Sequence, residues 1–153
     1  MSKFMWWIDE PMVMGCANPS DEDLERLRPQ GFRIAVSLLE ESKQPPRYDK
    51  ESARAAGWSI HSIPIVESHA PSVEQIQNFV TRVTGLPKGT KVLVFCESGK
   101  GRTACMAAAF WITKGLTASA AITRISESCS ASDWLTAERR GVLTEYERLQ
   151  RCL

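Results

Sequence analysis

The sequence predicts a single α/β domain over residues 1–153, with a mainly parallel central sheet and helices on both of its faces. Short runs of branched and apolar residues, such as 32–39 and 91–95, alternate with segments of helical periodicity. After residue 102 the pattern changes to consecutive helices. A chain of 153 residues with 43% hydrophobic residues has enough apolar material for one core.

The first elements are two short strands and a helix. Residues 4–8 and 12–15 are apolar and flank the turn residues 9–11, which is typical of two strands joined by a turn. Ser20 precedes three acidic residues, so it is expected to cap a helix whose first turn carries negative charge. The buried strand at 32–39 follows this helix.

The middle of the chain alternates loops with further elements. Residues 40–48 contain two adjacent prolines and are expected to form a surface loop. A short helix over 49–56 should end at Gly57. The strand at 58–65 then leads into a second loop, residues 67–71.

The second half of the chain is expected to be mostly helical. Ser72 and Gln75 match a capping box, and the apolar stripe behind them ends at Gly85. The strand at 91–95 follows, and three helices come after it. Their predicted ranges are 103–114, 117–128 and 133–150, the last one capped by Ser132.

The composition argues against several function classes. Lys and Arg number 19 against 18 Asp and Glu, so the net charge of +1 gives no general attraction to nucleic acid or to a membrane. The longest uncharged apolar run, 104–112, is too short to span a bilayer, and no signal peptide is evident. Five cysteines without a Cys-x-x-Cys pair suggest neither a disulfide framework nor a zinc site, and they favour reduced thiols in the cytoplasm. We expect a monomer that needs no cofactor.

The segment from Cys96 to Thr103 carries the chemistry. Arg102 follows Cys96 by six residues, glycines stand at 99 and 101, and the segment lies between a predicted strand and a predicted helix. From the composition, the chance of such a pattern is on the order of 0.001 per chain. The turn can form a cradle of backbone N–H groups, and the following helix adds the positive end of its dipole. Together with the Arg102 guanidinium, these groups would stabilise a thiolate and bind a phosphoryl group.

This segment resembles the signature loop Cys-x-x-Gly-x-Gly-Arg-Ser/Thr of cysteine-dependent protein tyrosine phosphatases, in its dual-specificity form. The chain is similar to the small atypical dual-specificity phosphatases, including the compact archaeal type. The similarity extends to VSLLEE at 36–41, IPI at 63–65 and PS at 71–72, which occur in the order typical of that family.

The resemblance implies a two-step reaction without a metal. It makes Cys96 the nucleophile, Arg102 the phosphate clamp, and Thr103 the group that assists departure of the thiolate. The backbone of the remaining loop residues would bind the phosphoryl oxygens: Glu97, Ser98, Gly99, Lys100 and Gly101. Glu67 occupies the position of the family's general acid, which is usually Asp. Asp133 is the alternative acid and His69 a weaker third candidate.

Two further residues depart from the pattern of that family, and Glu97 bears on the choice of substrate. Phe95 replaces the His that usually precedes the nucleophile and orders the loop, and Ala104 replaces a common Gly. Glu97 is expected to place a negative charge inside the cradle, which argues against strongly anionic inositides, whereas Lys100 favours them.

The expected function is hydrolysis of phosphoesters, with a phosphorylated protein, above all phosphotyrosine, or a small aryl phosphate as substrate. One alternative is a phosphatase of phosphoinositides or of RNA 5′ ends. The other is a catalytically weak phosphate-binding module. No nucleic-acid or membrane partner is expected.

Overall fold

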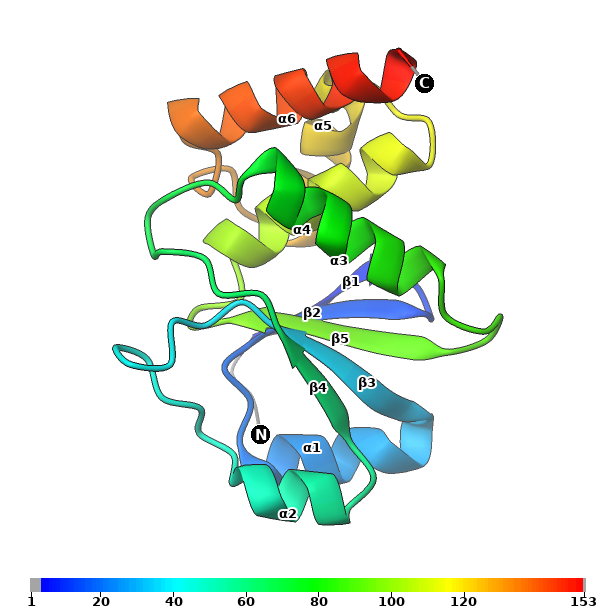
Figure 1. The fold of residues 1–153 in the computed structure, drawn as a ribbon, viewed down its shortest axis with the longest axis vertical. Helices are drawn as coiled ribbons and strands as arrows, with labels where there is room; N and C mark the ends of the chain where they lie inside the picture. The colour runs from blue at the N-terminus through cyan, green and yellow to red at the C-terminus, as the bar shows by residue number, and fades with distance from the viewer. Residues whose placement is uncertain (1–3, 153) are drawn as a thin grey trace.

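The computed structural model describes residues 4–152 as a five-stranded sheet between two layers of helices (Figure 1). The strand order across the sheet is β1-β2-β5-β3-β4. Their bounds are β1 (Met5–Asp9), β2 (Val13–Ala17), β3 (Phe32–Ser37), β4 (Ser59–Ser62) and β5 (Lys91–Cys96). The edge strand β1 runs antiparallel to β2, and every other neighbouring pair is parallel. The predicted α/β architecture is therefore confirmed.

The helices divide unequally between the two faces of the sheet (Figure 1). One face is covered by α1 (Asp21–Leu27), the 3-10 turn η1 (Arg28–Gln30) and α2 (Lys50–Ala55). The other face is covered by α3 (Val73–Thr84), α4 (Gly101–Thr113), α5 (Ala118–Ser128) and α6 (Ala137–Arg151). Within residues 4–152, no helix combines the length and the apolar character needed to cross a membrane.

The central strand β5 faces hydrophobic cores on both sides, which explains its continuous apolar sequence. Val94 and Cys96 belong to the core under α3 to α6. Leu93 and Phe95 belong to the core under α1 and α2. Because successive side chains of a strand alternate between faces, Cys96 and its neighbour Phe95 point to opposite sides of the sheet.

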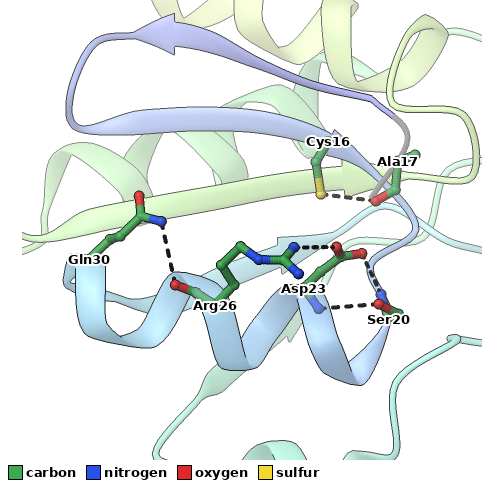
Figure 2. A network of polar contacts seen from close by, with 6 residues as sticks. All are labelled: Cys16, Ala17, Ser20, Asp23, Arg26 and Gln30. Carbon is green, nitrogen blue, oxygen red and sulfur yellow. Dashed lines mark hydrogen bonds and ion pairs between the residues drawn. The ribbon is translucent and has the colours of Figure 1, made fainter. Parts of the chain in front are cut away.

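The start of α1 confirms the predicted cap and is shown in Figure 2. The Ser20 hydroxyl accepts a hydrogen bond from the backbone N–H of Asp23 at 3.2 Å. The Asp23 carboxylate in turn accepts from the backbone N–H of Ser20 at 2.9 Å and pairs with Arg26 at 3.7 Å. This reciprocal capping box fixes the point at which the chain leaves β2 and turns into the helix.

Several predicted boundaries differ from the structure. The strand expected over 58–65 is shorter in the structure: β4 ends at Ser62, and residues 63–66 have no regular secondary structure. The last helix begins later than expected: Thr136, not Ser132, caps α6 by accepting from the N–H of Arg139. Residues 133–135 are therefore a connecting segment outside the helix.

The parallel direction of β2 to β5 determines where the loops meet. The carboxyl ends of β2, β3, β4 and β5 all lie at one edge of the sheet. The loops that follow these four strands therefore converge there, which is the usual location of a site in an open α/β sheet.

Candidate active site

The turn between β5 and α4 is fixed by contacts to its backbone. The indole Nε1 of Trp6 donates to the carbonyl oxygen of Gly99 at 2.8 Å. The backbone N–H of Asn18 donates to the carbonyl oxygen of Glu97 at 3.1 Å. Trp6 in β1 and Asn18, which directly follows β2, thus hold the shape of the turn.

Gly99 is the position in this turn at which glycine is required. Its φ of +77° lies in the left-handed region, which L side chains rarely adopt. A Cβ at this position would lie 2.5 Å from the backbone nitrogen of Ala17 and 2.6 Å from the carbonyl carbon of Cys16. The close approach of two backbone segments therefore excludes a side chain here.

Cys96 lies at the base of the turn with 1% of its surface exposed. The hydroxyl of Thr103, one turn into α4, donates to its Sγ at 3.1 Å. The preceding residue, Phe95, is buried in the opposite core and makes an edge-to-face contact with Tyr48, with ring centroids 6.0 Å apart. Phe95 is therefore a packing residue on the other face of the sheet.

Two other buried cysteines remain protonated. Burial, together with nearby Asp23 and Cys96, raises the pKa of the Cys16 thiol far above its ordinary value. This thiol donates to the carbonyl oxygen of Ala17 at 2.9 Å (Figure 2). Burial likewise raises the pKa of Cys105 to about 12. Neither residue competes as a thiolate nucleophile at neutral pH.

Arg102 joins three segments at the carboxyl edge of the sheet. Its guanidinium Nη1 donates to the carbonyl oxygens of Ile65 at 2.9 Å and Leu38 at 3.3 Å. Its Nη2 donates to the side-chain oxygen of Gln44 at 3.0 Å. The side chain is 2% exposed, and these neutral acceptors fix its position without cancelling its charge.

A cavity of about 290 Å³ opens over Cys96 and brings most of the predicted site together. Its lining consists of Glu67, Ser68, Cys96, Ser98, Lys100, Gly101, Arg102, Asp133, Trp134, Thr136 and Arg139. Both candidate general acids, Glu67 and Asp133, are therefore at the cavity. Their catalytic roles remain predictions.

The loop that carries Glu67 is tied to two other parts of the protein. The backbone N–H of Glu67 donates to Glu40 at 3.2 Å, and that of Ala70 donates to Glu138 at 2.9 Å. His69 pairs with Glu138 at 3.3 Å and is absent from the lining of the cavity among the residues described. The Ala70 N–H and His69 hold the pKa of the Glu138 carboxyl below its usual range.

The expectation that Glu97 places its charge inside the cradle is wrong. One carboxylate oxygen accepts from Asn18 Nδ2 at 3.0 Å, and the other lies 4.0 Å from the Arg47 guanidinium. The side chain thus points away from the cavity because the 38–48 loop and the exit of β2 offer it hydrogen-bonding partners. Only the backbone of Glu97 belongs to the turn.

Sequence reasoning missed three residues that shape the site. Asn18 is 2% exposed and also donates to the carbonyl oxygen of Pro45 at 3.1 Å, linking two loops. Gln44 holds Arg102, and Arg139 lines the cavity from α6. Asn18 directly follows a strand, and this position could have predicted that it lies near the site. Nothing local in the sequence marks Gln44 or Arg139.

A larger cavity of about 430 Å³ lies on the other side of the sheet, beside α2. Its walls include Tyr48, Lys50 and Trp58, but neither Cys96 nor Arg102. The smaller cavity is therefore the candidate active site, because it contains Cys96, the predicted nucleophile, and part of the turn that follows it.

Comparisons with known proteins show that the chain is similar to phosphatases. Residues 12–116 match the family described as "Polymorphic toxin system, DSP-PTPase phosphatase". Phosphatidylglycerophosphate phosphatase PTPMT2 of Arabidopsis thaliana is 30% identical in an alignment that covers 97% of this chain. The chain spans 66% of the length of that relative.

Solved structures show the same fold over nearly the whole chain. Tk-PTP in its active form is 26% identical, with a TM-score of 0.83 and coverage of 97% of this chain and 99% of that one. PTPMT1 in complex with PI(5)P is 21% identical, with a TM-score of 0.87 and 98% coverage of both chains. Human DUSP28 is 14% identical, with a TM-score of 0.79 and coverage of 99% and 97%.

Replacing Gly99 by Ala is expected to disturb the cradle. The added Cβ meets backbone atoms and cannot move them cheaply, so we expect unfolding to become easier by about 1–3 kcal/mol. Gly141→Ala, within α6 where nothing lies within 4 Å of the new Cβ, is the matched control. It should stabilise the protein by about 0.5–1 kcal/mol. Urea unfolding of both variants measures the difference, and equal stabilities would contradict the assigned turn geometry.

Proposed function

The chain belongs to the DSP-PTPase phosphatase family, and on this premise we propose that it hydrolyses phosphate monoesters through a cysteinyl-phosphate formed on Cys96. The observation that carries the proposal is one cavity containing both Cys96 and the buried Arg102 guanidinium. A nucleophile beside a fixed cation is the arrangement that phosphoryl transfer requires.

Arg102 is suited to bind the phosphoryl group. Nη1 uses both of its hydrogens on carbonyl oxygens, and Nη2 uses one on Gln44. The Nε hydrogen and the second Nη2 hydrogen remain, and they form the side of the guanidinium that binds two oxygens at once. We infer that this side, together with the backbone N–H groups of the turn, holds the phosphoryl oxygens.

In the first step, the Cys96 thiolate attacks phosphorus and the bond from phosphorus to the ester oxygen breaks. The ester oxygen leaves with a proton from the general acid, for which Glu67 is our choice and Asp133 the alternative. In the second step, water attacks the cysteinyl-phosphate and gives its proton to the same carboxylate. The bond from phosphorus to sulfur breaks, and the Thr103 hydroxyl, 3.1 Å from Sγ, stabilises the departing thiolate.

For the substrate we propose the phosphate monoester of a phospholipid head group. The cavity presents three cationic side chains, Lys100, Arg102 and Arg139, against the carboxylates of Glu67 and Asp133. The Glu97 carboxylate would repel an anionic head group inside the cavity, but it is turned towards Asn18 and Arg47 instead. The Arabidopsis relative is named a phosphatidylglycerophosphate phosphatase, which supports this choice. A protein phosphotyrosine is the second candidate, because the matching family is described as a DSP-PTPase.

Cys96→Ser should abolish turnover of 4-nitrophenyl phosphate, because an alcohol at this position is a far weaker nucleophile than a thiolate. We expect a loss of at least about 1,000-fold in kcat. Orthovanadate should still bind, as measured by calorimetry. Cys152→Ser, at an exposed residue, is the control and should keep full activity. Equal, feeble rates in wild type and Cys96→Ser would instead favour a phosphate-binding module.

The substrate class can be tested with two phosphate monoesters. We expect kcat/KM for dioctanoyl phosphatidylglycerophosphate to exceed that for a neutral phosphotyrosine peptide by about 10-fold or more, since an additional charge-assisted contact contributes that much. Phosphate release is measured for both under the same salt conditions. A preference for the peptide would reassign the enzyme to proteins.

The general acid can be identified by its dependence on the leaving group. Glu67→Gln should lower kcat by about 100-fold for an alkyl phosphate, whose oxygen needs a proton to leave. The effect should be much smaller for 4-nitrophenyl phosphate, whose leaving group is stable as an anion. Asp133→Asn, at the other carboxylate of the cavity, is the comparison. If the leaving-group dependence follows Asp133→Asn instead, the role belongs to Asp133.

A further inference from the structure

Arg139 is a second buried cation in the cavity that the two-step reaction does not use. It lies in the first turn of α6, is 6% exposed, and lines the cavity together with Cys96 and Arg102. Its Nη1 donates to the carbonyl oxygen of Trp134 at 2.8 Å, while its buried Nε has no hydrogen-bonding partner.

The guanidinium of Arg139 lies directly against the start of α4. A Cβ added to Gly101 would lie 2.8 Å from its Nη2, 2.9 Å from Nη1 and 3.0 Å from Cζ. Gly101 precedes Arg102, so the second guanidinium stands beside the residue that clamps the scissile phosphate. The absence of a side chain at 101 is what leaves room for it.

Within residues 4–152, no carboxylate forms a direct ion pair with this guanidinium, although its charge contributes to lowering the pKa of the Glu138 carboxyl. The ion pairs that the structure shows for this stretch do not include Arg139. Its neighbour Glu138 is engaged by His69 and by the N–H of Ala70. A buried charge without a partner is costly, and proteins normally pair such charges. Since the group borders the cavity and Glu138 makes its hydrogen bonds elsewhere, an anionic group of the substrate can pair with it directly.

We propose that Arg139 binds a second anionic group of the substrate, next to the phosphate monoester that is cleaved. This proposal rests on the proposed phosphatase activity and makes Arg139 a specificity-determining residue. Arg102 already supplies two N–H groups to the scissile phosphate, so a second guanidinium beside it suits a different anion. A phosphodiester and a carboxylate share the required chemistry, because both present two oxygens to a guanidinium.

Three substrates separate the possibilities. Phenyl phosphate carries only the scissile group, 3-carboxyphenyl phosphate adds a carboxylate, and dioctanoyl phosphatidylglycerophosphate adds a phosphodiester. In the wild-type protein, KM for 3-carboxyphenyl phosphate or for the lipid should be at least about 3-fold below that for phenyl phosphate. If neither doubly anionic substrate has a lower KM, the proposal is overturned without any variant being needed.

Arg139→Gln should lower kcat/KM by about 10-fold or more for the favoured doubly anionic substrate, chiefly through KM. Phenyl phosphate should change by less than about 3-fold. If Arg139→Gln lowers kcat/KM only for the lipid, the group that Arg139 binds is the phosphodiester. If kcat/KM falls for both the lipid and 3-carboxyphenyl phosphate, Arg139 accepts either anion. An equal loss for all three substrates would overturn the proposal, since it would indicate a merely structural role.

Two further variants complete the test. Arg139→Lys keeps the charge and should retain part of the preference, whereas Arg140→Gln, at the exposed neighbour, should change nothing. If wild type fails to hydrolyse even phenyl phosphate, the proposed function fails. If wild type hydrolyses all three substrates and Arg139→Gln loses no preference, only the role of Arg139 is refuted.

Discussion

The site depends on the hydrogen bonds that hold the buried guanidinium of Arg102 in place. The guanidinium hydrogen bonds to the end of β3 at Leu38, to the loop after β4 at Ile65, and to Gln44 in the loop between them. All three acceptors are neutral, so the cation keeps its charge while its position is fixed. Without this residue, the loops at the carboxyl edge would lose their common partner and the cavity its main attraction for an anion.

The alternation of β5 explains how one strand serves the core and the chemistry at once. Cys96 points to the face covered by α4, where Thr103 meets its sulfur, and Phe95 points to the face covered by α1 and α2. A large apolar side chain before the nucleophile is therefore compatible with the site, because it packs where the cysteine does not. Phe95 helps to fix the end of β5 by packing in the core under α1 and α2, and this packing needs no polar group.

Much of the fold could be predicted because its signals are local. The order of strands and helices, the capping boxes at Ser20 and Ser72 and the cradle from Cys96 to Thr103 follow from patterns within a few residues. Two features of the site could not be predicted because they depend on residues distant in sequence. The Glu97 side chain is directed by Asn18, and Arg102 is held by the neutral side chain of Gln44. The start of α6 was misplaced because both Ser132 and Thr136 are good caps, and only packing decides between them.

The loop carrying Glu67, our choice for the general acid, is anchored to two other parts of the protein. Its backbone is held by Glu40 at one end and by Glu138 at the other, and Ser68 between them has a φ of +71°. Glu67 and Ser68 both line the cavity, so the anchored segment lies beside it. Anchoring from two sides limits how far this segment can move, which keeps the Glu67 carboxylate at the cavity. The position of this candidate acid thus depends on carboxylates from two other segments, Glu40 and Glu138.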